Sequence, residues 1–154
     1  MADIGEAWFL RDLSPRELDK VKAATGRKRF AAEDAIVQVG EKVGSLYVID
    51  TGAVRVVVPV EGQHGREEQV LADLAAGDCF GEFSFVDRKP ASASVYASEA
   101  THLFAIPYRE LDRLIEQDPY LARTLLKSLL ATIVGRFRRT DATLALARYV
   151  IQYV

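Results

Sequence analysis

The sequence predicts an α+β protein in which an antiparallel β-barrel or sandwich is flanked by helices at both ends. Helical periodicity occupies both ends of the 154-residue chain, and short β-branched runs between glycine-containing turns fill its middle. The 49% hydrophobic content is sufficient for one sizeable core. We expect a single domain, 1–154, made of an N-terminal helical segment (1–30), a β-barrel (31–107) and C-terminal helices (108–154).

The N-terminal helix is predicted to begin at Ser14 and Pro15. Ser14 can cap the helix, Pro15 suits its first position, and Glu17 can complete a capping box. Gly26 is expected to end it. Its apolar side chains should pack against the barrel.

Six short strands are predicted after this helix. Their expected ranges are 35–39, 46–50, 54–60, 69–74, 92–97 and 101–106. The intervening residues 61–68 are polar and contain two glycines, so we expect an exposed hairpin loop there. Many short strands at this spacing are typical of a barrel or sandwich.

Helical periodicity returns at residues 108–117, and Pro119 marks the start of a further, long amphipathic helix. An interruption near Thr140 and Asp141 is an alternative. If continuous, the helix would be about 50 Å long, more than one small barrel can cover. Its apolar side chains would then contact either a second chain or, after folding back as two helices, their own barrel. These side chains are Leu121, Leu125, Leu129, Ile133, Phe137, Leu144, Ala147, Ile151 and Val154.

The composition argues against several classes of protein. Twenty Lys and Arg against 22 Asp and Glu give a net charge of −2, so there is no overall basic character for binding nucleic acid. The single cysteine, Cys79, excludes an internal disulfide. No secretory signal or run of about 18 apolar residues is present. We therefore expect a cytoplasmic location without membrane contact, for a chain that is either complete or part of a larger regulator.

Catalytic motifs are absent from the sequence. There is no Gly-x-Ser-x-Gly elbow, no His-Glu-x-x-His and no Walker-type phosphate loop. His64 and His102 are too far apart for a typical metal-ligand spacing. We expect no enzyme activity, no metal and no cofactor.

A glycine-containing turn at residues 77–85 has the composition of an anion-binding site. Gly77 and Gly81 permit backbone conformations in which consecutive N–H groups converge on a phosphate. Glu82 would repel a phosphate directly, but it can accept hydrogen bonds from a sugar hydroxyl beside that phosphate. The turn therefore predicts a sugar phosphate as ligand.

Residues 77–82 and 92–95 together resemble the phosphate-binding cassette of the cyclic-nucleotide-binding domain family, which includes catabolite activator proteins and regulatory subunits of cyclic-AMP-dependent kinase. Residues 9–14, 40–41, 46–54 and 103–107 extend this resemblance over most of the chain. It implies an antiparallel double-stranded β-helix, a jelly-roll or cupin-like barrel. It also implies a regulatory module that binds cyclic AMP or cyclic GMP, transmits occupancy through its C-terminal helices, and forms a homodimer through the last helix.

The same resemblance implies a set of ligand-binding residues. They are Phe80, Gly81, Glu82, Phe83, Ser84, Ala91, Ser92, Ala93 and Ser94. Ala91 is a departure, because ligand-binding members usually carry an arginine after the cassette proline. Loss of a bidentate arginine contact weakens binding roughly 10- to 100-fold. Strand alternation should direct Ser92 and Ser94 to the same face.

Nearby basic residues have two interpretations. Arg88 and Lys89 could replace the missing cation, although a solvated loop tip is the simpler expectation. Arg123, Arg136, Arg138 and Arg139 are expected on a solvated helical face. Two alternative functions remain: a degenerate scaffold without nucleotide, used for dimerisation or protein docking, and the sensor half of a Crp/Fnr-type transcription regulator.

Overall fold

Eight antiparallel strands form two four-stranded sheets. The computed structural model describes residues 3–62 and 65–153, with side chains described as far as residue 143. The strand orders are β1-β8-β3-β6 and β2-β7-β4-β5. The strands are β1 (Gly26–Phe30), β2 (Ala35–Val37), β3 (Ser45–Thr51), β4 (Ala53–Gly62), β5 (Gly65–Ala75), β6 (Cys79–Phe80), β7 (Ser94–Ala97) and β8 (Thr101–Pro107). The predicted α+β jelly-roll architecture is confirmed.

Helices lie at both ends of the chain, and a short one interrupts the strands. They are the 3-10 helices η1 (Ile4–Glu6) and η2 (Trp8–Leu10), and the α-helices α1 (Pro15–Ala23), α2 (Glu82–Asp87), α3 (Tyr108–Gln117) and α4 (Pro119–Tyr153). The predicted capping box of α1 is present, with Ser14 Oγ accepting from Glu17 N and Glu17 Oε2 accepting from Ser14 N. Helix α1 stops at Ala23, slightly before the predicted end at Gly26.

Strand β1 is not predicted by the sequence. Its residues are mainly basic and exposed, so they lack the apolar alternation that identifies a half-buried strand. Pairing with β8 holds it in place, from Gly26 opposite Ala105 to Phe30 opposite Thr101. This strand depends on a partner about 75 residues away in the chain, which local patterns do not reveal.

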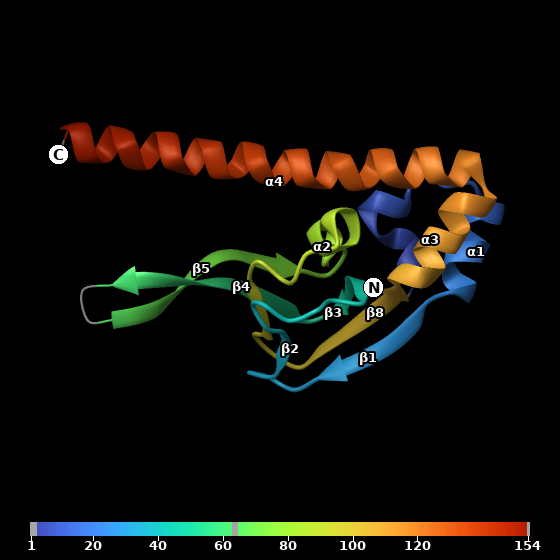
Figure 1. Cartoon of the computed structure of the whole chain (residues 1–154), viewed down its shortest axis with the longest axis horizontal. Helices are drawn as coiled ribbons and strands as arrows, with labels where there is room; N and C mark the ends of the chain where they lie inside the picture. Colours follow the sequence, from blue (N-terminus) through green and yellow to red (C-terminus); the bar gives the residue numbers. More distant parts are fainter. Residues whose placement is uncertain (1–2, 63–64, 154) are drawn as a thin grey trace.

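The prediction of a loop at residues 61–68 is wrong. Strands β4 and β5 continue pairing as far as Gly62 opposite Gly65, so most of that polar segment is strand. The hairpin projects from the barrel (Figure 1). The outer part of the hairpin is polar and has little apolar surface to bury. The ladder of backbone hydrogen bonds continues there without support from apolar burial.

Helix α4 is continuous, so the alternative of a break near Thr140 is not observed. It runs along one side of the molecule, with α2 between it and the strands (Figure 1). Leu121, Leu125 and Leu129 of α4 are almost fully buried in a core with η1, η2, α1 and α3. Each such leucine contributes roughly 2 kcal/mol by burial. The predicted side chains beyond residue 143, from Leu144 to Val154, lie outside the described part.

A second core fills the barrel between the two sheets. It includes Tyr47 and Ile49 of β3, Val54 of β4 and Val95 of β7. In the described residues, no helix is long and apolar enough to cross a membrane.

Candidate functional site

The predicted anion-binding turn joins β6 to α2. Gly81 precedes α2 with φ of 89°, a left-handed conformation that disfavours a side chain. A Cβ atom there would lie 2.8 Å from the carbonyl oxygen of Ser45. The hydroxyl of Tyr108, at the start of α3, donates to the Gly81 carbonyl at 2.5 Å. The close approach of Ser45 and the hydrogen bond from Tyr108 fix the position at which α2 begins.

Glu82 is buried under α4 and contacts Arg136. Only 2% of Glu82 is exposed, and its Oε1 atom accepts from Nη1 of Arg136. Nη2 of the same guanidinium donates to the carbonyl oxygen of Cys79. One arginine on α4 therefore joins the end of β6 to the beginning of α2.

The prediction of a solvated Arg136 is wrong, since only 22% of its side chain is exposed. A signal in the sequence was available. Arg136 follows Leu125, Leu129 and Thr132 at helical spacings of 11, 7 and 4 residues, so it lies on the buried face of α4. In contrast, Arg138 and Arg139 are exposed, as predicted.

Ala91, where the resemblance implies an arginine in ligand-binding members, is 6% exposed and packs in the barrel core. Its amide donates to the Glu41 carbonyl and its own carbonyl accepts from Gly40 N, both at 2.8 Å. The main chain at this position is thus tied to the turn at residues 40–41. A longer side chain at residue 91 would have to extend out of this core.

The two predicted serines have different environments. Strand β7 begins at Ser94, so Ser92 lies before the strand and the expected alternation does not apply to it. Ser92 is exposed, whereas Ser94 is 4% exposed and its Oγ atom accepts from Val39 N at 2.9 Å. The expectation that both serines share one face is therefore wrong.

The other predicted ligand residues surround Glu82. Phe80 is buried and stacks on Tyr47 with ring centroids 5.1 Å apart. Ser84 is buried, Ala93 is half-buried and Phe83 is 49% exposed. The structure thus places the residues of this segment on β6, on α2 and on the loop before β7. Their roles in binding a ligand stay predictions.

Arg88 contacts the helices while half of its side chain stays exposed. Its guanidinium lies over the rings of Phe85 and Tyr108 and pairs with Asp112 of α3, with Nη2 2.5 Å from Oδ1. Burial, followed by the nearby charge of Glu82, raises the pKa of the Tyr108 hydroxyl. Tyr108 therefore remains a neutral donor at physiological pH. Lys89 is exposed.

The single cysteine, Cys79, lies in this segment and is buried. Burial raises the pKa of the Cys79 thiol to about 12, so its reactive thiolate form is suppressed at neutral pH. No cluster of three or more potential metal ligands occurs among the residues described. His102 is exposed on β8, and His64 lies outside the described residues.

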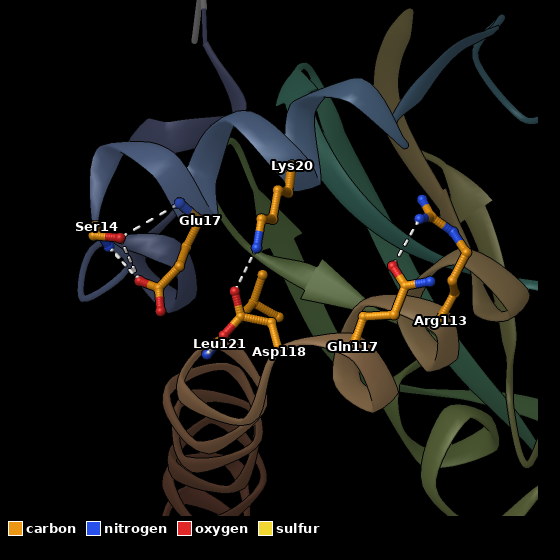
Figure 2. A network of polar contacts seen from close by, with 7 residues as sticks. All are labelled: Ser14, Glu17, Lys20, Arg113, Gln117, Asp118 and Leu121. Carbon is orange, nitrogen blue, oxygen red and sulfur yellow. Dashed lines mark hydrogen bonds and ion pairs between the residues drawn. The ribbon is translucent and has the colours of Figure 1, made fainter.

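A separate polar network holds the base of α4 (Figure 2). Asp118 links α3 to α4, and its carboxylate accepts from Lys20 Nζ of α1 at 2.5 Å and from Leu121 N at 3.1 Å. Lys20 and Asp118 also line a hollow together with Ala23, Arg113, Leu114 and Gln117. The hollow lies away from Glu82, at the opposite end of the buried part of α4.

Residues 27–118 match the cyclic nucleotide-binding domain family. This match covers more than half of the chain and includes the β6–α2 turn, Glu82 and the loop to β7. The chain belongs to the cyclic nucleotide-binding domain family. The segment from β6 to β7 lies within the matched residues, and its role as a phosphate-binding cassette stays a prediction.

Two of the relatives are a cyclic AMP receptor protein and a kinase regulatory subunit. The chain is 31% identical over 137 residues to the Cyclic AMP receptor protein of Thermus thermophilus, covering 89% of this chain and 60% of that protein. It is 30% identical over 105 residues to a cAMP-dependent protein kinase regulatory subunit of Blastocladiella emersonii, covering 68% of this chain and 25% of that protein. The chain therefore spans only part of these relatives.

Solved structures show the same fold. A cyclic nucleotide-binding domain from Methylobacillus flagellatus superposes with a TM-score of 0.83 at 25% identity, covering 94% of this chain and 79% of that one. The Thermus thermophilus Catabolite Activator Protein gives a TM-score of 0.75 at 28% identity, covering 92% and 63% respectively.

Proposed function

We propose that this protein is a non-enzymatic regulatory module that binds a cyclic nucleotide, cyclic AMP or cyclic GMP, at the cassette. The observation that carries the proposal is the buried carboxylate of Glu82, positioned by the β6–α2 turn in a member of this family. A carboxylate is acceptor-only, so it suits the hydroxyls of a ribose. Phe80, Gly81, Phe83, Ser84, Ser92 and Ala93 would line the ligand, and Ala91 and Ser94 would support it from the barrel side.

Occupancy would be transmitted to α4 through Arg136. A ribose hydroxyl that donates to Glu82 competes with the guanidinium for the same carboxylate oxygens. Arg136 would then turn from Glu82 toward the ligand or toward solvent, and α4 would lose one of its contacts with the cassette. The ligand thereby shifts the equilibrium between two positions of α4.

Isothermal titration calorimetry tests this proposal directly. Cyclic AMP, cyclic GMP and cyclic di-GMP are titrated into the wild-type protein and into a Glu82→Ala variant. Binding heat for one nucleotide, lost in the variant, supports the proposal. Absence of binding heat with all three nucleotides in a folded wild-type protein would contradict the proposal.

A homodimer through α4 is the second part of the proposal. On the face of α4 turned away from its own core, Leu126, Leu130 and Phe137 are 43%, 59% and 67% exposed, with Ile133 half-buried between them. We call these four residues the α4 seam. Their spacings of 4, 3 and 4 form a heptad repeat, which the sequence continues at Thr140, Leu144, Ala147 and Ile151.

This repeat favours another copy of the same helix as the occupant of the seam. Exposed apolar side chains at coiled-coil spacing are unfavourable in a monomer and pack well against an identical helix. Analytical ultracentrifugation of Phe137→Glu should show a monomer where the wild type dimerises. Tyr120→Glu is the matched control, since Tyr120 is 78% exposed on α4 but lies outside the seam. Equal dimerisation by both variants would contradict the assignment.

The degenerate scaffold is a second candidate function, favoured by the Arg136 contact with Glu82 and by the buried Ala91. Arg136 satisfies the carboxylate of Glu82 without a ligand, and Ala91 offers no cation to a phosphate. The sensor half of a Crp/Fnr-type regulator is a further proposal, because the chain covers 60% of the Thermus receptor protein. A cytoplasmic location, without membrane contact or direct DNA binding by this segment, is proposed for all of these functions.

A further inference from the structure

Arg136 lies between the buried face of α4 and the α4 seam. It immediately precedes Phe137 of the seam, and Phe137 is the first core position of its heptad because Thr140 and Leu144 follow at 3 and 7 residues. Arg136 therefore occupies the flanking position g. Asp141, which follows Thr140, occupies the flanking position e on the other side of the seam.

These two flanking positions meet in a parallel coiled coil. Position g of one helix faces the position e five residues further along its partner, which places Arg136 opposite Asp141 of the partner subunit. An antiparallel pair brings positions g together, and in α4 these positions hold no acidic residue. Arg136 thus has an acidic partner in a parallel pair and none among the facing g positions of an antiparallel pair.

Asp141 has the properties of an available partner. It is exposed, and among the described residues no cationic side chain forms an ion pair with it. Arg136 is bound to Glu82 and the Cys79 carbonyl. Both terminal nitrogens of Arg136, Nη1 and Nη2, point at the cassette, so a close pair across the seam requires the guanidinium to turn away from Glu82.

We propose that Glu82 of the same chain and Asp141 of the partner subunit compete for Arg136 in an α4 homodimer. When Glu82 is taken by another donor, Arg136 moves to the flank of the seam and strengthens the dimer. When Arg136 stays on Glu82, the dimer lacks this pair. The competition rests on the proposed homodimer, and it would couple a ligand on Glu82 to self-association.

A double-mutant cycle on the full chain tests this competition without any nucleotide, so its result is independent of whether the cassette binds one. Dimer dissociation constants are measured by analytical ultracentrifugation for the wild type, Glu82→Gln, Asp141→Asn and the double variant. Glu82→Gln should tighten the dimer about two- to fivefold, the range for one partly exposed ion pair. That gain should vanish in the double variant and in about 0.5 M salt.

Control variants distinguish the pair between Arg136 and Asp141 of the partner subunit from general effects of a substitution on the dimer. Arg138→Gln removes an exposed arginine two residues from Arg136 and should leave the dissociation constant unchanged. Thermal unfolding of each variant verifies that Glu82→Gln is folded. Equal effects of Asp141→Asn in the wild-type and Glu82→Gln backgrounds would overturn the proposal. A monomer in all variants would overturn it as well, whereas calorimetry with cyclic AMP would still decide the ligand separately.

Discussion

The guanidinium of Arg136 on α4 contacts the carboxylate of Glu82 on α2, although 54 residues separate them in the chain. This contact connects the long C-terminal helix to the cassette at the residue expected to hold the ligand's sugar. The side chain of Glu82 is 3% exposed and that of Arg136 is 22% exposed, so the pair is largely shielded from water. The contribution of Glu82 to the stability of the fold should therefore depend strongly on the presence of Arg136, and the reverse should also hold.

Replacement of Arg136 by alanine should destabilise the protein by roughly 2 kcal/mol, because it leaves a buried carboxylate without its cationic partner. Urea denaturation provides the measurement. The additional change Glu82→Gln should restore part of the loss, since a neutral amide is less costly to bury than a charge. Arg138→Ala, an exposed control, should change the free energy of unfolding by less than about 0.5 kcal/mol. A double variant no more stable than Arg136→Ala would contradict the pairing.

Gly81→Ala should destabilise the fold by roughly 2 kcal/mol or more. The residue has φ of 89°, and an added Cβ would lie 2.8 Å from the Ser45 carbonyl oxygen. Gly135→Ala on α4 is the opposite control, because its Cβ would meet nothing within 4 Å and alanine is favoured in a helix by about 1 kcal/mol. The midpoint temperature of thermal unfolding should therefore fall for Gly81→Ala and rise for Gly135→Ala. A shift in the same direction would argue against the left-handed turn at Gly81.

The ion pair at the base of α4 should make the stability of the fold depend on pH in the acidic range. The hydrogen bond from Lys20, followed by that from the Leu121 amide, holds the pKa of Asp118 below its ordinary value. Because the folded-state pKa is the lower one, the stabilisation is present above the unfolded value of about 3.9 and is lost as pH falls through the folded value. Asp118→Asn should thus be less stable than the wild type at pH 7, with a difference that shrinks below about pH 4.

Urea midpoints measured across this acid range check the prediction. Asp19→Asn is a suitable control, since Asp19 is exposed on α1 next to Lys20. A difference between Asp118→Asn and the wild type that stayed constant down to the lowest pH would show that the carboxylate charge is not involved. Figure 2 shows the ion pair between Lys20 and Asp118 whose negative charge the substitution would remove.

Local sequence signals predicted the elements that depend on neighbouring residues. The capping box from Ser14 to Glu17 and the span of α3 after Pro107 are confirmed, because caps and proline boundaries act within one turn. The barrel strands rich in β-branched residues are also found. Strand β1 was missed, since its basic residues form a strand only through their pairing with β8.

The candidate site could be located from the sequence only in part. Gly81 and Glu82 lie within the residues that match the family, and their role in a cassette stays a prediction. To predict the contact between Arg136 and Glu82, one must know the direction in which α4 crosses the cassette. This direction is a property of tertiary packing, and helical periodicity does not determine it. Likewise, the different environments of Ser92 and Ser94 follow from where β7 begins, and strand boundaries are the least certain part of a sequence-based assignment.

Introducing the missing cation by Ala91→Arg separates the two candidate functions. If the cassette binds cyclic nucleotides, an arginine beside the phosphate should increase affinity for cyclic AMP by about 10- to 100-fold in calorimetry. The main-chain hydrogen bonds of Ala91 to the turn at residues 40–41 should hold the backbone in place. Ala91→Leu adds bulk without charge and should not increase affinity. A stably folded Ala91→Arg protein that binds neither cyclic AMP nor cyclic GMP would favour the scaffold, because the phosphate would then have a cation available and still no site.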